Sequence, residues 1–389
     1  MLRDVYDVAI AGGSLAGAMT GYHLARAGLR VVLLEQAVRP PRRKACGEGL
    51  FPGGVRELAA AGLLPQLEPC SRALEGVRFN AYGAVASAAL GSNGLCARGV
   101  RRDGLDPLVL EHAEAAGVHV ERGVTVTGLM IDQRRAAGVR TSGGDVRARV
   151  VVGADGLHSR VRRLAGLDGE ATGDRYGVSV HMTFDHEVEP WVDVHFARDH
   201  ELYLTPVGPT ELNVALLTRK GRMSRFAGDL DASFAAFLRQ HPAMPRGWSV
   251  TGPASAAGPF PRRARRTHRG NVVLVGDAAG FYDGITGEGM SLALRSARLC
   301  ARAVRQHRET GSLDPLRLYD RERRALARNS ELMGRLMLAL GPRERLARWS
   351  TRNLARHPET FERLAAINAG EAGLSTIRPR DGIALTLGL

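Results

Sequence analysis

The chain has 389 residues, a length sufficient to bury a large core in two packed lobes. Its formal net charge is +14. No apolar run reaches the roughly 20 residues that a membrane-spanning helix requires, and Arg3, Asp4 and Asp7 surround a short strand near the N-terminus, so we expect a soluble, unexported, cytoplasmic protein. The four cysteines have no spacing typical of a zinc site, so we expect no metal and reduced thiols.

The positive charge comes almost entirely from arginine, since Lys44 and Lys220 are the only lysines. The densest arginine cluster, at 262–266, has no interleaved aromatic residues, so no nucleic-acid partner is expected. The charge instead suits an anionic small molecule. Any membrane contact is expected to be peripheral, and the oligomeric state is left open.

The first predicted unit has the order strand, helix, strand. Residues 5–11 predict a short strand, residues 15–28 a helix and residues 30–34 a second strand that leads to Glu35 and Gln36. This is the βαβ arrangement that binds dinucleotides.

The turn inside this unit contains the run Gly12, Gly13, Ser14, Leu15, Ala16 and Gly17. Gly12 permits a tight turn, Gly17 lets helix and strand pack closely, and the helix N-terminus offers free amides to a diphosphate. Ser14 replaces the usual middle glycine, and its hydroxyl can donate to a phosphate. Glu35 follows Gly12 by 35 − 12 = 23 residues, against about 20 in the dinucleotide fingerprint, and would accept hydrogen bonds from a ribose.

Two further loops have the same character. Gly153-Ala154-Asp155-Gly156 follows an apolar strand at 150–152, and Gly276-Asp277-Ala278-Ala279-Gly280 follows another at 272–275. Each places small residues where a backbone must approach a diphosphate. Three such loops in this order predict that the chain binds FAD.

Together these motifs resemble those of the flavoprotein superfamily that includes the aromatic hydroxylases of para-hydroxybenzoate hydroxylase type and the geranylgeranyl reductases. The resemblance implies an α/β fold with a Rossmann-like FAD-binding lobe of glutathione-reductase type, an antiparallel β-sheet substrate lobe and a C-terminal helical region. The expected boundaries are 1–75, 98–170 and 262–305 for the FAD lobe, 76–97 and 171–261 for the substrate lobe, and 306–389 for the helical region.

The resemblance also implies roles for single residues. Asp155 would contribute to FAD and NAD(P)H binding, Asp277 would contact the FAD ribityl chain, and Arg102, in competition with its neighbour Arg101, would reach the FAD. A helix N-terminus at 287–290 would lie against the pyrimidine side of the flavin. The expected cofactor-binding residues are Gly12, Gly13, Ser14, Ala16, Gly17, Glu35, Gln36, Cys46, Gly47, Arg102, Asp155, Gly276, Asp277, Gly287, Gly289 and Met290.

Between residues 176 and 217 apolar and polar residues alternate, which predicts an antiparallel sheet with one buried face over the flavin lobe. His181, His195 and Tyr203 fall in its strands and could point into the pocket, although a structural role is favoured for each. After residue 280 the pattern is helical, and we expect these helices to pack on the two lobes rather than lie on a membrane.

The segment 44–50 contains Cys46 and resembles the part of the geranylgeranyl reductases that carries a cysteine beside the flavin. A small buried hydrophobic role is slightly favoured for this cysteine. No catalytic residue is identified, and the candidates are Cys46, His195 and Tyr203.

Three functions are compatible with these motifs. The preferred one is an NAD(P)H-dependent FAD monooxygenase of secondary metabolism that hydroxylates an apolar phenolic or polyketide-like molecule through a flavin C4a-hydroperoxide. NADPH or NADH would dock transiently, since no second dinucleotide-binding unit is predicted. The alternatives are a geranylgeranyl-reductase-like enzyme that reduces prenyl double bonds and a non-catalytic FAD-binding protein.

Overall fold

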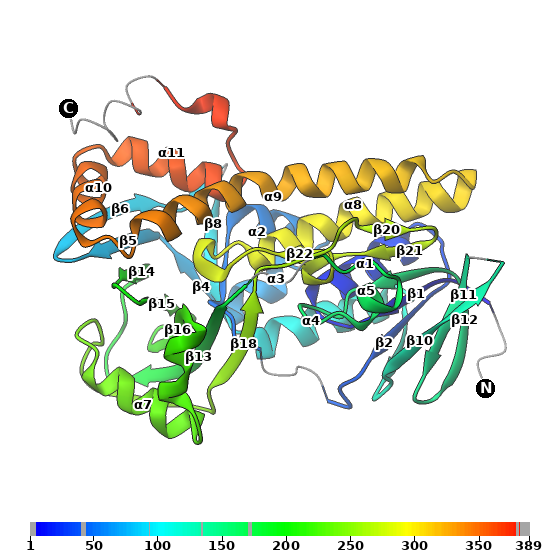
Figure 1. The fold of residues 1–389 in the computed structure, drawn as a ribbon, viewed down its shortest axis with the longest axis horizontal. Coiled ribbons are helices and arrows are strands. Elements are labelled where there is room, and N and C mark those ends of the chain that lie inside the picture. Colours follow the sequence, from blue (N-terminus) through cyan, green and yellow to red (C-terminus); the bar gives the residue numbers. More distant parts are fainter. Residues whose placement is uncertain are drawn as a thin grey trace.

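The computed structural model describes residues 5–39, 44–92, 94–133, 135–169, 173–378 and 381. Two large β-sheets lie at opposite ends of the molecule, and long helices run along one side from one sheet to the other (Figure 1). No helix among the described residues is long and apolar enough to cross a membrane.

The first sheet contains the predicted βαβ unit. Its strands β12, β1, β2 and β9 are parallel neighbours, β21 pairs with the other side of β12, and β10 and β11 form an antiparallel extension. Runs of valine, isoleucine and leucine fit the parallel strands because helices or other segments cover both faces. The strands are β1 (Tyr6–Ala11), β2 (Val31–Glu35), β9 (His119–Arg122), β10 (Val126–Asp132), β11 (Arg135–Thr141), β12 (Gly144–Gly153), β20 (His268–Arg269) and β21 (Val272–Leu274).

The second sheet is antiparallel except where β14 pairs with β5 in parallel. Its alternating pattern buries one face in a compact apolar cluster against the helix α7 (Leu230–Gln240). The strands are β5 (Gly76–Ala81), β6 (Ala84–Ala89), β13 (Arg175–Phe184), β14 (Trp191–Phe196), β15 (His200–Pro206), β16 (Glu211–Arg219), β17 (Trp248–Val250) and β18 (Ser255–Phe260).

Smaller elements join the two sheets. A four-stranded sheet of β3 (Gly49–Leu50), β4 (Ser71–Leu74), β7 (Gly91–Ser92) and β8 (Leu95–Val100) lies between them, and β19 (Arg262–Arg263) pairs with β22 (Gly280–Phe281). Besides α7, the α-helices up to residue 310 are α1 (Leu15–Arg26), α2 (Pro52–Ala60), α3 (Leu64–Leu67), α4 (Arg102–Ala115), α5 (Arg160–Leu164), α6 (Lys220–Met223) and α8 (Gly289–Thr310).

The C-terminal helices cover both lobes, as expected. Helix α8 packs against α1, α9 (Asp314–Leu340) lies along α8, and α10 (Glu344–Arg356) and α11 (Pro358–Asn368) pack on β6 (Figure 1). The α/β fold with a Rossmann-like lobe, an antiparallel sheet and C-terminal helices is therefore confirmed. The residue numbers given above for the lobe boundaries stay a prediction.

Candidate flavin site

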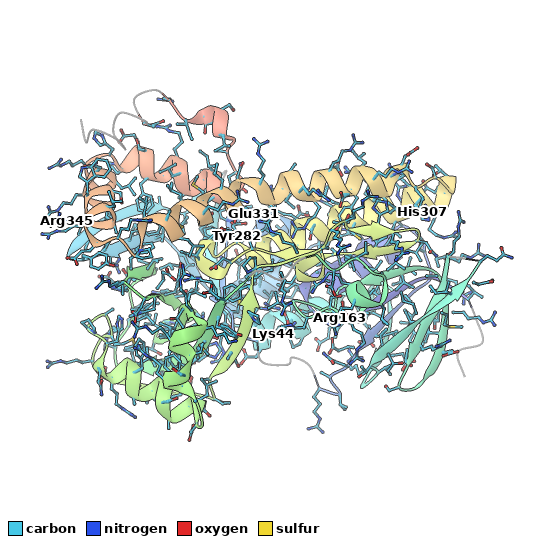
Figure 2. The ribbon with its side chains drawn as sticks, viewed as in Figure 1. Lys44, Arg163, Tyr282, His307, Glu331 and Arg345 are labelled. Carbon is cyan, nitrogen blue, oxygen red and sulfur yellow. The ribbon has the colours of Figure 1, made fainter. Side chains whose placement is uncertain are left out.

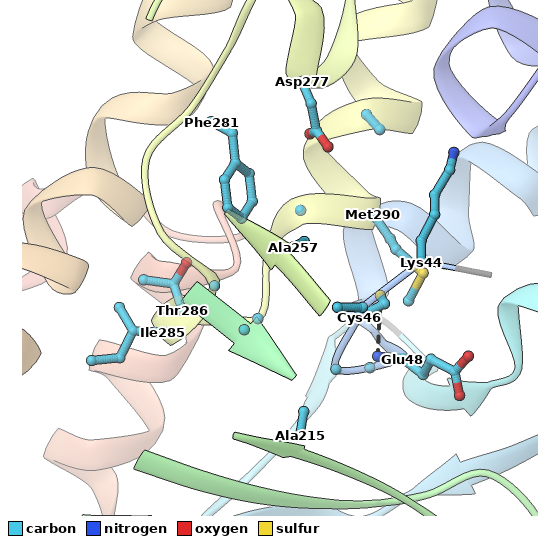
Figure 3. A pocket seen from close by; sticks show the side chains of 18 of the residues that line it. Lys44, Cys46, Glu48, Ala215, Ala257, Asp277, Phe281, Ile285, Thr286 and Met290 are labelled. Carbon is cyan, nitrogen blue, oxygen red and sulfur yellow. Dashed lines mark hydrogen bonds between the residues drawn. The ribbon is translucent and has the colours of Figure 1, made fainter. Parts of the chain in front are cut away.

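A continuous cavity of about 740 Å³ runs between the two sheets and under the C-terminal helices. Its walls include the turn after β1, the segment 44–51, the second sheet and α9 to α11. Figure 3 shows Lys44, Cys46 and Met290 close together on one side, with Phe281 and Ile285 across from them. The volume lies in the range of roughly 300–1,000 Å³ that is typical of ligand sites.

The first glycine motif forms a tight cradle at one end of this cavity. Gly12 has φ +104°, and a Cβ atom there would lie 2.5 Å from the carbonyl oxygen of Ala154. A Cβ atom at Gly17 would lie 1.9 Å from the carbonyl oxygen of Gly12, so only glycine allows α1 to begin this close to β1. The amide of Gly13 donates to Glu35 Oε2 at 2.7 Å, which fixes this carboxylate at the rim of the cradle.

Arg102, Ser14 and Asp106 form a charged cluster at the N-terminus of α1. Arg102 Nη2 donates to Ser14 Oγ at 2.7 Å, and Arg102 forms a two-bond ion pair with Asp106 at 2.8 and 2.9 Å. Burial opposes the charge of Arg102, but Asp106 outweighs burial and raises its pKa. Arg101 lies outside the cavity lining and pairs with Asp103. Asp106 was not among the predicted site residues, although its spacing of four from Arg102 on a predicted helix was a usable signal.

The carboxylate of the middle motif caps a helix, and its expected role toward FAD and NAD(P)H stays a prediction. Asp155 lines the cavity, but its carboxylate accepts hydrogen bonds from Ser159 Oγ and from the amides of Arg160 and Val161. Asp155 therefore holds the N-terminus of α5 in place, and its backbone rather than its side chain forms the rim near Gly12.

The last motif contributes an acid and a helix N-terminus. Asp277 lines the cavity; burial raises its pKa, and Lys44 and Arg102 oppose that shift. Gly287 lies two residues before the start of α8 and has the left-handed conformation, with φ +69°. Gly289 and Met290, the first two residues of α8, line the cavity. The first amides of α8 thus lie at the cavity wall, where a helix favours negative charge.

The segment around Cys46 is fastened to the second sheet and to α4. Asn213 Nδ2 donates to the Cys46 carbonyl oxygen at 2.7 Å, and the Cys46 amide donates to Ser179 Oγ. Glu48, with φ +55° and only 3% exposure, accepts from the Arg102 amide and contacts His181 Nε2 at 2.6 Å. These residues keep Cys46 at the cavity wall, and sequence reasoning missed Glu48 and Asn213.

Burial raises the pKa of the Cys46 thiol, so the group keeps its proton at neutral pH. Lys44 is exposed to the cavity, and desolvation by the surrounding protein and the charge of Arg102 lower its pKa (Figure 3). The sequence did not predict that Lys44 would lie near Asp277 in this wall.

The other two catalytic candidates differ in position. Tyr203 lines the cavity, but its hydroxyl donates to the Ile285 carbonyl at 2.7 Å. His195 is not part of the cavity lining: its neighbours Val194 and Phe196 line the cavity, so the alternation along β14 turns His195 to the other face. The expectation that His195 could reach the pocket was wrong for this reason.

Most of the expected cofactor-binding residues come together. Gly17 and Gly276 lie behind the wall, where they permit close packing instead. The expected residues that line the cavity are Gly12, Gly13, Ser14, Ala16, Glu35, Gln36, Cys46, Gly47, Arg102, Asp155, Asp277, Gly287, Gly289 and Met290.

The family model described as FAD binding domain matches residues 5–331 of the chain. The chain belongs to this FAD-binding family. The match confirms the resemblance to flavoproteins of para-hydroxybenzoate hydroxylase type and, with it, FAD as the cofactor of the family.

Known relatives of this flavoprotein have different reactions. Digeranylgeranylglycerophospholipid reductase 2 of Methanothermobacter thermautotrophicus is 29% identical over 79% of this chain and 80% of its own. Rifampicin monooxygenase of Streptomyces venezuelae is 27% identical over 75% of this chain and 62% of its own. The solved structure of the flavin-dependent brominase Bmp2 has a TM-score of 0.82 with 19% identity and covers 94% of each chain, a likeness of fold alone.

The geometry of the cavity fits FAD. The turn at Gly12 leaves no room for a side chain, Arg102 brings positive charge to the start of α1, and Glu35 is held where a ribose would meet it. The amides at the start of α8 would face the ring system, where they would stabilise negative charge on reduced flavin.

A buried acid directly precedes α8 and carries a prediction of its own. Glu288 is 1% exposed, and neither carboxylate oxygen has a hydrogen-bond partner among the described residues. Burial raises its pKa well above 4.5. The pKa of Glu288 is therefore higher in the folded protein than in the unfolded chain. The contribution of Glu288 to the free energy of unfolding is most favourable below about pH 4.5, and it decreases as the pH rises toward the folded-state pKa.

We expect Glu288→Gln to become more stable relative to the wild type as the pH rises, by about 1.4 kcal/mol for each pH unit up to the folded-state pKa. Urea unfolding at pH 5 and pH 8 measures the difference. Glu309→Gln, at an exposed position of the same helix, is the control and should show no such trend. An equal effect of Glu288→Gln at both pH values would contradict the burial argument.

Proposed function

We propose that this FAD-dependent oxidoreductase is an NAD(P)H-dependent monooxygenase that hydroxylates an apolar, phenolic or polyketide-like molecule. The observation that supports this function is the apolar extension of the cavity, which continues past the flavin segment into a chamber between β5, β14 and the C-terminal helices. Its walls include Phe79, Phe196, Met337, Leu354, Phe361 and Leu364.

The chemistry of the bound FAD, once reduced, is to activate oxygen for transfer to an electron-rich carbon. The chain contributes a site that excludes water, because aromatic and aliphatic side chains form the chamber, and water would hydrolyse a reactive intermediate. The same walls would orient an apolar ring and a long apolar substituent. Arg160 and Arg163 also line the cavity, and their charge suits an anionic nicotinamide reductant.

One observation favours a second function, the reduction of prenyl double bonds. Cys46 lies in the cavity wall as a protonated thiol, and saturation of a double bond needs a proton donor on the substrate. The prenyl-lipid reductase among the relatives agrees with this alternative. The apolar chamber suits an isoprenoid chain as well as a substituted phenol.

Oxygen consumption separates the two functions. We expect the purified holoprotein with NADPH to consume oxygen in proportion to hydroxylated product when an alkyl-substituted phenol is supplied, and we expect Cys46→Ser to retain most of this turnover. Anaerobic saturation of a polyprenyl substrate that is lost in Cys46→Ser would favour the reductase. Failure of both NADPH and NADH to bleach the flavin would favour the non-catalytic alternative.

A further inference from the structure

Helix α10 has two faces with different surroundings. Its inner face closes the cavity, since Ala347, Ser350, Thr351 and Leu354 all line it. Its outer face is not covered by any described part of the chain, and it combines positive charge with apolar side chains. Figure 1 shows this helix at the end of the molecule away from the first sheet.

The outer face carries Arg345, Arg348, Arg352 and Arg356, all exposed. No ion pair joins any of these four to a carboxylate of the described residues, whereas many other exposed arginines are paired, such as Arg122 with Glu114. Figure 2 shows Arg345 at the outer edge of the molecule. The sequence of the helix contains a single acid, Glu344, so the face has a clear excess of positive charge.

Large apolar side chains lie among these arginines. Trp349 is 42% exposed and Leu346 44% exposed, and on the preceding helix Leu332 and Leu336 are each 43% exposed. Leu336 also lines the cavity, so the apolar chamber reaches the surface beside α10. Exposed apolar residues next to the mouth of an apolar chamber mark a contact with an apolar partner.

We infer that the outer face of α10, with Leu332 and Leu336 of α9, docks on an anionic lipid bilayer. Arginines attract acidic headgroups, and tryptophan prefers the boundary between headgroups and acyl chains. The helix would lie on the surface without crossing it, because its other face is committed to the cavity. The binding does not depend on the reaction, but the idea that a lipophilic substrate passes from the bilayer into the chamber rests on the proposed function.

Vesicle binding of the full-length holoprotein tests this inference. The protein is expected to cosediment with vesicles of phosphatidylglycerol and phosphatidylcholine, to bind pure phosphatidylcholine weakly, and to dissociate at 0.5 M salt. With each basic residue worth a factor of about five, Arg345→Gln/Arg352→Gln should bind about 25-fold more weakly. Arg140→Gln/Arg147→Gln is the matched control, since these exposed arginines of β11 and β12 lie in the first sheet, have the same sequence spacing and change the net charge equally.

Tryptophan fluorescence locates the contact. The chain has three tryptophans, so Trp191→Phe/Trp248→Phe leaves Trp349 as the only tryptophan, and its emission on excitation at 295 nm should shift to the blue when anionic vesicles are added. The inference is overturned if the protein does not bind vesicles or if both arginine variants weaken binding equally. It is also overturned if Trp349 emission does not change on addition of vesicles, a result that would favour an acidic protein as the partner of this face. Turnover of a detergent-dispersed substrate should be the same in both arginine variants, which separates a failure of docking from a failure of the proposed reaction.

Discussion

Arg102→Ala is expected to give a protein that is purified largely without FAD. The variant removes the guanidinium beside the start of α1 and leaves the buried carboxylate of Asp106 without its ion-pair partner, with only the hydrogen bond from the Ser14 hydroxyl among the described residues. An uncompensated buried charge costs about 3–5 kcal/mol, and the lost attraction for the diphosphate adds to the loss of binding. The FAD absorbance per mole of protein and titration of the apoprotein with FAD measure the effect.

Arg101→Ala is the matched control because Arg101 is the adjacent residue and pairs with the partly exposed Asp103 instead. A partly exposed pair contributes at most about 1 kcal/mol, so this variant should keep its FAD. Arg102→Ala/Asp106→Asn should recover stability but not FAD affinity. If Arg101→Ala lost FAD and Arg102→Ala kept it, the role assigned to Arg102 would be wrong.

Arg175→Met is expected to destabilise the protein by about 3–5 kcal/mol. Arg175 is buried and bridges Glu201 at 2.7 Å and Asp283 at 3.0 Å, so it joins the second sheet to the segment that leads into α8. Both carboxylates outweigh burial and raise the pKa of Arg175, and both would be left without that charge. Urea unfolding followed by circular dichroism measures the loss.

Arg219→Met is the control that tests whether burial of the ion pair causes the loss of stability. Arg219 lies directly opposite Arg175 on the neighbouring strand, but its side chain is exposed. Its ion pair with Asp174 spans 3.4 Å between side chains that are 65% and 54% exposed, so we expect a change below about 1 kcal/mol. Arg175→Met/Glu201→Gln/Asp283→Asn removes the whole charged cluster and should regain much of the lost stability. No recovery in this triple variant would indicate that packing of Arg175 matters more than its charge.

The sequence was sufficient to predict the fold because the informative features are local. The turn at Gly12, the spacing to Glu35 and the alternation in the second sheet each follow from backbone geometry within a few residues or one βαβ unit. The same holds for the helices after residue 280, which are long and amphipathic.

The candidate site was predictable only where a motif carries it. Glu48 and Asn213 matter because the fold brings them to distant segments, and no pattern in one sequence pairs Asn213 with the Cys46 carbonyl, 167 positions away. The position of His195 depends on which face of β14 is turned to the cavity, and alternation alone does not say which face that is. Asp155 stands in its motif, but only the structure shows its carboxylate bound to α5.

The attachment of the Cys46 segment to the second sheet has a consequence for hybrid enzymes. Ser179, His181 and Asn213 belong to β13 and β16, yet they bond to Cys46 and Glu48 on the flavin side. A chimaera that borrows its substrate lobe from another flavoprotein would place foreign side chains under this segment. To exchange the substrate lobe successfully, residues 44–49 must therefore be replaced together with the sheet, both taken from the same donor protein.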